Sequence, residues 1–532
     1  MNRTTSILGL AMAMGTSATF GAKPTGNAVA ASTNNKRPNI LYIMTDQQRW
    51  DALGYSGNKV IKTPNLDRLA RSGAWFTQAV TQCPVSAPAR CAILTGVCIE
   101  KSRVMLNEDA LDKSLVVPYS TFDQVLAKND YYTEYYGKFH SPRSMAEVYR
   151  NPPQEGFSGA DLIINGDKVI YKKLLDERVP KRPLKEGEQY ASGVYNGVPY
   201  TTNPMDQRYG HQPGADIRKI KTEPHGCVDL PPDLTFTAYT ANAALKAMDR
   251  VAKNKPFVLS CSIVAPHPPT LSSEPYSSMY AAKDMPIPAT IADDMANNPY
   301  RRANGRQPEF ADPKRIGYFI SDYYAMVSEV DLWVGKLLDK LDQLGLTQNT
   351  VVIFTSDHGE MLGDHGMQSK FIFLEGSVHV PLIISYPGVI KPGTIVDAPV
   401  STFDIYPTLL NIVGIDSSQP DGYSLMPLTR GEKPKYDFAV SEWTASKPGV
   451  PNIMIRTKEW KLMLSYTDDT GKCDALFNMK ADPGEMNNLL GTNPAKGEQK
   501  TVVAGLQKKL VDYLTAIKHP RADQVAKRVI VK

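Results

Sequence analysis

Three apolar runs in this sequence each end abruptly in polar residues, and they constrain the fold more than any other feature. Ile40–Met44 leads into Asp46, Val351–Phe354 leads into Asp357, and the run FVLSCSIVAP leads into His267. Runs without polar alternation are typical of parallel strands that helices cover on both faces. The sequence therefore predicts a buried, mostly parallel sheet.

Segments with helical periodicity lie between these runs. They include TPNLDRLARSG, TFDQVLAKN, TAYTANAALKAMDRV and SDYYAMVSEVDLWVGKLLDKLDQLG, several with a polar cap and a following Gly or Asn. We predict an α/β fold with a large, mostly parallel sheet flanked by helices. Ligands of such sheets bind where the strands' carboxyl ends emerge. Asp46, His267, Asp357 and His358 are therefore expected to converge on one crevice.

The pattern of apolar and polar residues changes near Phe438. FAVSEW and NIMIRTKEWKLMLSY indicate short antiparallel strands, and TVVAGLQKKLVDYLTAI indicates a closing helix. We predict a catalytic domain over residues 37–435 and a smaller C-terminal α+β subdomain, with a small antiparallel sheet and a helix, over 436–532. Asn151–Asp233 is rich in Pro, Gly, Lys and Tyr with little periodicity, which predicts insertion loops that determine specificity.

The N-terminus has the pattern of an export signal. Arg3 precedes the apolar run Ile7–Met14, and small residues follow around Ala28-Val29-Ala30. The apolar run is too short for a stable membrane span. We predict a signal peptide over residues 1–30 and a periplasmic or secreted protein without a stable membrane span.

Composition narrows the partners only slightly. The net charge of +5 over 532 residues suits an anionic substrate, but no Lys/Arg block indicates a nucleic-acid face. The six cysteines form no zinc-binding spacing, and their pairing stays open.

Asp46, Asp357 and His358 would repel one another at the predicted strand ends unless a cation lay between them. Carboxylate oxygens suit a hard divalent ion, calcium more than magnesium at an irregular site. The imidazole of His358 is atypical for calcium and leaves a transition metal open. Each aspartate alone is more often a helix cap or a turn residue, but two matching strand ends favour the metal site.

Further fragments add cationic and proton-transferring groups. YYGKFHSP contains Lys138 and His140, VAPHPP contains His267, and MQSKFIFLEG contains Lys370. A tetrahedral anion would need such donors around it. Taken singly, each lysine is more often a solvated surface residue.

One motif connects these groups to a known family. SAPARCAILTG places Ser86, Pro88 and Arg90 at alternate positions, followed by Leu-Thr-Gly. This resembles the Cys/Ser-x-Pro-x-Arg signature of type I sulfatases, of the alkaline-phosphatase superfamily, and the similarity extends from about Asn39 to Leu489. The serine resembles the bacterial branch, in which a radical maturase converts it to Cα-formylglycine (3-oxoalanine).

The resemblance implies a mechanism centred on Ser86. The aldehyde is hydrated to a gem-diol held on the cation; one oxygen attacks sulfur, and the second hydroxyl then loses its proton so that sulfate leaves. Asp46, Asp357, His358 and Ser86 match the family's metal ligands. Gln47 stands where many members have a second Asp, as in choline-sulfatase-like members, and its ligation of the metal stays open.

The resemblance also assigns roles to the surrounding side chains. Arg90 bonds the diol and compensates the acidic cluster, and His140 takes the second diol proton. Lys138 and Lys370 bind sulfate, and His267 is a candidate general acid near the leaving oxygen.

The sequence predicts an exported sulfatase that uses one calcium ion per subunit. Its expected substrates are O-sulfated sugars from glycosaminoglycan, mucin or algal glycan. Three alternatives stay open: a choline-sulfatase-like or aryl sulfatase, a phosphate or phosphonate ester hydrolase, and a non-catalytic sulfated-glycan-binding protein with unmodified Ser86. Candidate contacts for an acidic sugar are Arg208, His211, Arg301 and Arg302.

Overall fold

The protein is described from a computed structural model. It describes residues 37–112, 114–149, 163–164, 168–185, 188–191, 195, 197–201, 225–252, 255–295, 298–300, 310–443, 452–466, 474–490 and 498–530. The chain from Arg37 to Lys532 is one compact unit. The predicted signal peptide lies outside the described residues. Of the described helices, none has the length and apolarity that crossing a membrane requires.

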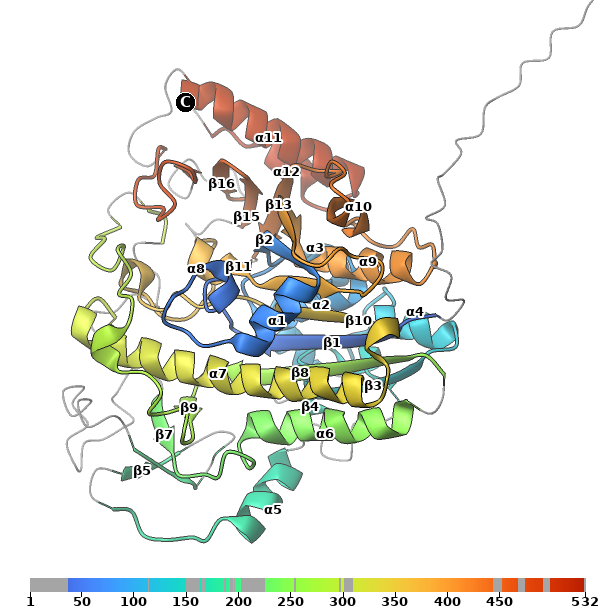
Figure 1. Ribbon diagram of the computed structural model, residues 1–532. Helices are drawn as coiled ribbons and strands as arrows, with labels where there is room; N and C mark the ends of the chain where they lie inside the picture. Colours follow the sequence, from blue (N-terminus) through green and yellow to red (C-terminus); the bar gives the residue numbers. More distant parts are fainter. Residues whose placement is uncertain are drawn as a thin grey trace, which may run out of the picture. The chain divides into compact units, whose positions relative to one another are not determined.

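A large sheet forms the centre of this unit (Figure 1). Its strand order is β11-β2-β12-β10-β1-β8-β3-β4, with β13 beside β2. The strands β10, β1, β8 and β3 are parallel to one another, whereas β12 and β11 pair antiparallel with their neighbours. The bounds are β1 Asn39–Asp46, β2 Ala74–Val80, β3 Tyr132–Lys138, β4 Ile163–Ile164, β8 Phe257–Pro266, β10 Thr350–Ser356, β11 His379–Val380, β12 Leu382–Ser385 and β13 Thr394–Ser401.

Helices cover both faces of the sheet (Figure 1). α1 (Pro64–Ser72), α6 (Phe236–Val251) and α7 (Pro313–Gln343) pack on one face. α2 (Ser86–Thr95), α4 (Phe122–Lys128) and α9 (Ile405–Ile412) pack on the other. Alternate residues of β1 enter the two cores, and all eight are buried, which is why the strand reads as one unbroken apolar run. The predicted fold class is confirmed.

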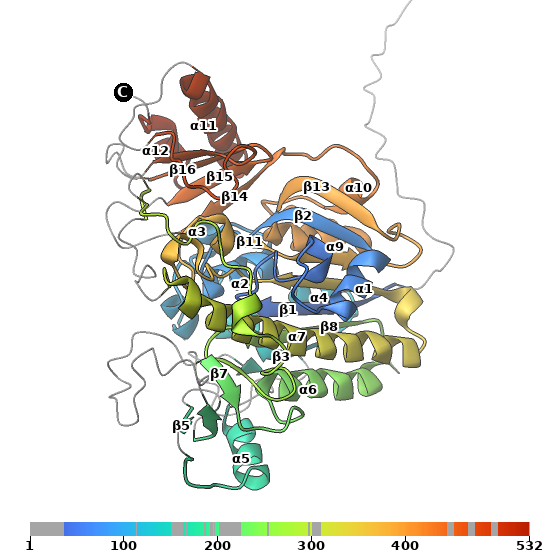
Figure 2. The ribbon, with the colours of Figure 1, turned by 60° about the vertical axis from the view of Figure 1, so that its left-hand side comes forward.

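A second, antiparallel sheet lies in the C-terminal part of the unit, in the order β14-β15-β16-β17. α11 (Glu498–Ala516) and α12 (Ala522–Lys527) pack on it (Figure 2). Its strands are β14 Phe438–Glu442, β15 Ile453–Thr457, β16 Trp460–Leu464 and β17 Ala475–Asn478. Three short helices lie outside this sheet: α3 (Ile99–Ser102), α8 (Glu375–Val378) and α10 (Met426–Thr429). A domain boundary at residue 436 stays a prediction.

The region predicted as insertion loops contains regular structure. α5 (Lys168–Arg178) precedes a small sheet of β5 (Glu188–Tyr190), β6 (Pro199–Thr201), β7 (His225–Val228) and β9 (Thr270–Ser272). The expectation of loops alone was wrong here. Strands of three or four residues are too short to show a two-residue alternation in the sequence.

The parallel strands place their carboxyl ends at one edge of the sheet. Thr45 in β1 pairs with Ser356 in β10, so Asp46 and Asp357 follow side by side. Asp46 also lies opposite Pro266 in β8, which brings His267 to the same edge. The topology therefore assembles side chains that are hundreds of residues apart.

Candidate active site

Three predicted metal ligands form a buried cluster at this edge. Asp46, Asp357 and His358 are fully buried, and one potential ligand atom from each lies within 4.8 Å of the others. They converge because β1 and β10 are adjacent and parallel, so both chains leave the sheet at the same point.

Ser86 faces this cluster from the first turn of α2. Its side chain is buried, and Oγ lies 2.9 Å from His358 Nε2. The amino end of a helix carries partial positive charge, which favours an oxyanion at this position. The sequence motif and the two strand ends thus belong to one site.

The protonation of His358 suits a metal ligand. Its Nδ1 lies 3.0 Å from the carbonyl oxygen of Gly359, so Nδ1 donates and Nε2 presents its lone pair to the cluster. Burial lowers the pKa of His358 well below its usual value, which keeps the ring neutral. Among the described residues, the buried Oδ1 of Asp46 has no hydrogen-bond partner. A lone pair and an orphaned carboxylate oxygen aimed at one point fit a divalent cation.

Arg90 holds the two carboxylates together. Its Nε donates to Asp357 Oδ2 and its Nη2 donates to Asp46 Oδ2, both at 2.8 Å, and the guanidinium is fully buried. Burial alone would raise the pKa of Asp46, but the charges of Lys138 and Arg90 hold it well below its usual value. Burial and the negative charge of Asp46 raise the pKa of Asp357 to about 6, although Arg90 and Lys138 oppose the rise. A cation between the two carboxylates would favour the ionised form of both.

Two lysines lie around the carboxylates. Lys138 Nζ is 2.6 Å from Asp46 Oδ2, and Lys370 Nζ donates to Gln47 Oε1 at 2.5 Å. Burial lowers the pKa of Lys370. In the described part of the site, Arg90, Lys138 and Lys370 face Asp46, Asp357 and Glu360, three cationic against three acidic side chains. A divalent cation would give this set an excess of two positive charges, which suits an anionic ester.

The two remaining predicted residues are histidines at the rim. His267 Nδ1 lies 2.7 Å from the carbonyl oxygen of Pro268, so Nε2, 4.0 Å from Asp46 Oδ1, faces the cluster with its lone pair. His140 is buried, and its Nδ1 has no hydrogen-bond partner in the described structure. Burial and the charge of Lys138 lower the pKa of His140 well below its usual value. The predicted catalytic and metal-binding residues therefore lie around one centre, and His140 belongs to it because it is close enough to interact with the charges of Lys138, Arg90 and Asp46.

Sequence comparison agrees with this geometry. Residues 38–415 match the family model described as "Sulfatase", and residues 363–515 match "N-sulphoglucosamine sulphohydrolase, C-terminal". The chain belongs to the sulfatase family. It is a sulfuric ester hydrolase, as the resemblance in the sequence implied.

Individual relatives and solved structures are similar to this sulfatase over most of its length. An "Ulvan-active sulfatase" of Formosa agariphila is 31% identical over 490 residues, which span 90% of this chain and 81% of that protein. The phosphonate monoester hydrolase of Agrobacterium radiobacter has a TM-score of 0.71 at 24% identity, over 90% of this chain and 96% of that one. A protein solved with its substrate D-glucosamine-2-N,6-O-disulfate has a TM-score of 0.68 at 22% identity, over 93% and 100%. At such identities the two structures show a common fold alone.

The structure adds Glu360 to the site of the sulfatase. This buried carboxylate accepts hydrogen bonds from Gln47 Nε2 and from the backbone N–H groups of Leu362 and Ser369. It thereby turns the amide oxygen of Gln47 toward Lys370. In the sequence, Glu360 is simply an acidic residue directly after Asp-His-Gly. Its role cannot be predicted from that position, because it depends on the contact with Gln47 that the fold creates.

A second buried group resembles a metal site but lacks the right protonation. Ligand atoms of Cys98, Glu442 and His519 lie within 4.8 Å of one another. However, the backbone N–H of Arg521 donates to His519 Nδ1 at 3.0 Å, which leaves the proton on Nε2, 2.9 Å from Glu442 Oε1. We interpret the group as a buried contact between β14 and the C-terminal helices. The five described cysteines are free thiols, and Cys473 lies outside the described residues.

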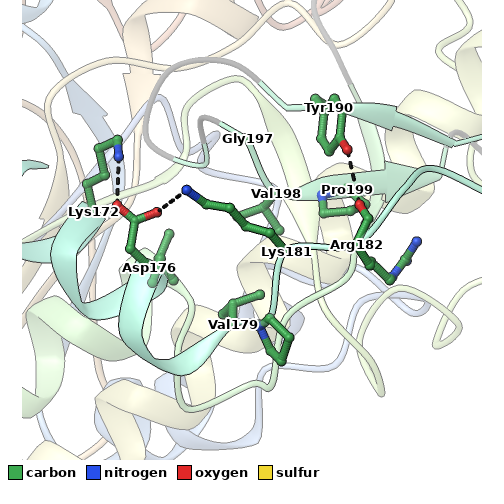
Figure 3. A pocket seen from close by; sticks show the side chains of 11 residues that line it. Lys172, Asp176, Val179, Lys181, Arg182, Tyr190, Gly197, Val198 and Pro199 are labelled. Atoms are coloured by element: carbon green, nitrogen blue, oxygen red, sulfur yellow. Dashed lines mark hydrogen bonds and ion pairs between the residues drawn. The ribbon is translucent and has the colours of Figure 1, made fainter.

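A separate cavity of about 290 Å³ lies between α5 and β6 (Figure 3). Lys172 and Lys181 line it, and both pair with Asp176, while Arg182 pairs with Glu188. Its described lining contains none of the predicted site residues, and its cations are already neutralised. Arg208, His211, Arg301 and Arg302, predicted as sugar contacts, lie outside the described residues.

Proposed function

We propose that this sulfatase is exported and removes O-sulfate groups from polysaccharide-derived sugars, using formylglycine at position 86 and one divalent cation, calcium. The single observation that carries the site chemistry is the position of Ser86. Its Oγ lies 2.9 Å from the lone-pair nitrogen of His358, beside the orphaned oxygen of Asp46. If residue 86 stayed a serine, the side-chain base at hydrogen-bond distance would be His358, which itself belongs to the acidic cluster.

Asp46, Asp357, His358 and the oxygen of residue 86 would hold the cation. Carboxylate oxygens suit calcium. Arg90 and Lys138 contact the Oδ2 atoms, the backbone N–H groups of Gln47 and His358 donate to Asp357 Oδ1, and Asp46 Oδ1 is left without a donor among the described residues. Gln47 could ligate the cation only if its amide oxygen, which accepts a hydrogen bond from Lys370, turned away from that lysine. When bound, the cation would neutralise the carboxylates and lower the pKa of the attacking oxygen.

The chain's own residues would bind the ester and transfer its protons. Lys138 and Lys370 stand where they can hold sulfate oxygens, and Arg90 fixes the carboxylates. Burial, Lys370 and Lys138 lower the pKa of His267, so its ring is neutral without substrate. A bound sulfate ester would offset the lysine charges, raise that pKa and let Nε2 protonate the leaving oxygen. Neutral His140 can accept the proton released at residue 86.

A carbohydrate substrate is supported by the relatives' names and by the region around the site. The relative at 31% identity is called an ulvan-active sulfatase, and one protein of the same fold was solved with a disulfated glucosamine. The small sheet that contains β5, β6, β7 and β9 continues directly from His267, because β9 begins at Thr270. Such an elaboration beside the catalytic edge suits a substrate larger than the ester group itself. Export is supported by the signal-like pattern of residues 1–30.

The decisive experiment couples mass spectrometry to a substrate panel. Protein produced with a formylglycine-generating radical maturase should show a Ser86 peptide lighter by two hydrogens. That protein should hydrolyse defined sulfated mono- and disaccharides faster than choline sulfate, aryl sulfate, or aryl phosphate and phosphonate esters. A Ser86→Ala variant, made in parallel, should be inactive on all of them. Full activity of that variant, or preference for the phosphonate ester, would refute the proposal.

A further inference from the structure

We propose that Phe371 and Trp443 form an aromatic platform on which the sulfated sugar ring stacks; this inference rests on the proposed carbohydrate substrate. Phe371 directly follows Lys370 in the sequence. The phenyl side chain is 38% exposed, although the neighbouring lysine is buried. An exposed aromatic ring next to a buried cation is placed to contact a ligand that the cation binds.

The backbone holds Phe371 in a conformation that its residue type does not favour. Its φ is +76°, in the left-handed region, where bulky residues are rare outside functional sites. Ser369, on the other side of Lys370, has a φ of +75°. A glycine or an asparagine would adopt this conformation more easily and expose less apolar surface. The chain therefore keeps a phenylalanine at a position whose backbone conformation favours glycine or asparagine.

Contacts from three other segments fix this stretch of backbone. The N–H of Phe371 donates to the carbonyl oxygen of Pro84 at 3.2 Å, two residues before Ser86. The N–H of Ser369 donates to Glu360 Oε1 at 2.5 Å, and the N–H of Phe373 donates to Tyr300 Oη at 3.0 Å. Lys370 therefore turns into the site while Phe371 projects at its rim.

The ring lies within reach of a bound ester. Its centroid is 5.9 Å from Lys370 Nζ, the ammonium that contacts Gln47 in the site. Trp443, just after β14, lies with its ring 6.0 Å from that of Phe371 at an angle of 42°. A sulfate held by Lys370 would carry its sugar directly against these two rings.

The charges around the platform favour a sugar over a cationic group. The C–H face of a pyranose packs on the negative face of an aromatic ring without competing for the lysines. A quaternary ammonium would also be attracted to the rings, but here Lys370 already occupies the neighbouring position and would repel it. Phe371 and Trp443 lie on one side of the expected ligand position, which suits stacking of a sugar ring. A quaternary ammonium is typically bound by aromatic rings that surround it.

The test compares Phe371→Leu with the parent enzyme, both carrying formylglycine. Losing the ring should raise KM for the best sulfated disaccharide about tenfold, with kcat changed less than about threefold. The inhibition constant of inorganic sulfate should stay within about twofold, because Lys138 and Lys370 are intact. Phe371→Tyr should retain the parent KM, and Trp443→Leu should resemble Phe371→Leu. Tyr386→Leu, which removes a partly buried aromatic ring just after β12, at the edge of the sheet opposite the site, is the matched control and should have no effect.

Each other outcome has a defined meaning. An unchanged KM in Phe371→Leu overturns the platform while leaving the proposed function intact. Equal losses for the disaccharide and for inorganic sulfate would mean that Phe371 only positions Lys370, which also overturns the platform. If the parent enzyme hydrolyses no sulfated saccharide but does hydrolyse another ester, the proposed function fails, and the platform fails with it. Tighter binding of choline sulfate than of the disaccharide would likewise refute a sugar platform.

Discussion

Replacing Lys461 with methionine should strongly destabilise the protein. This lysine in β16 is fully buried, and its Nζ lies 2.7 Å from Glu375 Oε1 and 2.6 Å from Glu485 Oε1. It also donates to the carbonyl oxygen of Phe373 at 3.0 Å. The variant would leave the buried carboxylate of Glu485 and the half-buried carboxylate of Glu375 with one cation fewer. Two charge-assisted contacts at about 1.5–3 kcal/mol each agree with the roughly 3–5 kcal/mol that breaking a buried ion pair costs.

Equilibrium urea unfolding of parent and variant measures this loss. Lys458→Met is the matched control, because Lys458 pairs with Asp397 at the surface, where the two side chains are 65% and 48% exposed. That pair should contribute less than about 1 kcal/mol. Adding Glu485→Gln to Lys461→Met should recover part of the stability by removing one uncompensated charge. A loss for Lys461→Met no larger than that of Lys458→Met would refute the reasoning.

Three further perturbations test the rest of the site and core. Chelation of divalent ions should abolish hydrolysis and lower the melting temperature, because a cation that binds only the folded state stabilises it, and added calcium should restore both; retention of activity after exhaustive chelation would contradict this. Glu360→Gln should raise KM about tenfold, because an amide has one acceptor oxygen for three donors, and a KM equal to that of the parent would exclude a positioning role. Burial raises the pKa of Glu329 from 4.5 to about 7, so the folded state loses stability as pH rises across that interval. Glu329→Gln should therefore stabilise by about 3 kcal/mol at pH 8 and by less than about 1 kcal/mol at pH 5, and a gain equal at both pH values would contradict the sign.

The central strands and the polar groups at their ends can be predicted from local sequence alone. Ile40–Met44 can be predicted as a strand because its residues are buried on both faces of the sheet. That burial requires apolar residues at successive positions, which the sequence shows directly. The Ser86–Arg90 motif is likewise local. Patterns of this kind can be detected in a sequence because neighbouring residues of one helix or strand have similar, regularly repeating environments.

Which distant groups meet follows from the packing of the whole chain. Glu360 contacts Gln47 across 313 positions, and Lys461 in β16 contacts Glu375 in α8. The strands β5, β6 and β7 are three or four residues long and leave no periodicity to detect. The aromatic pair of Phe371 and Trp443 has no sequence signature either. Such contacts depend on strand order and on docking of the second sheet, which arise from the packing of the whole chain and not from any one segment.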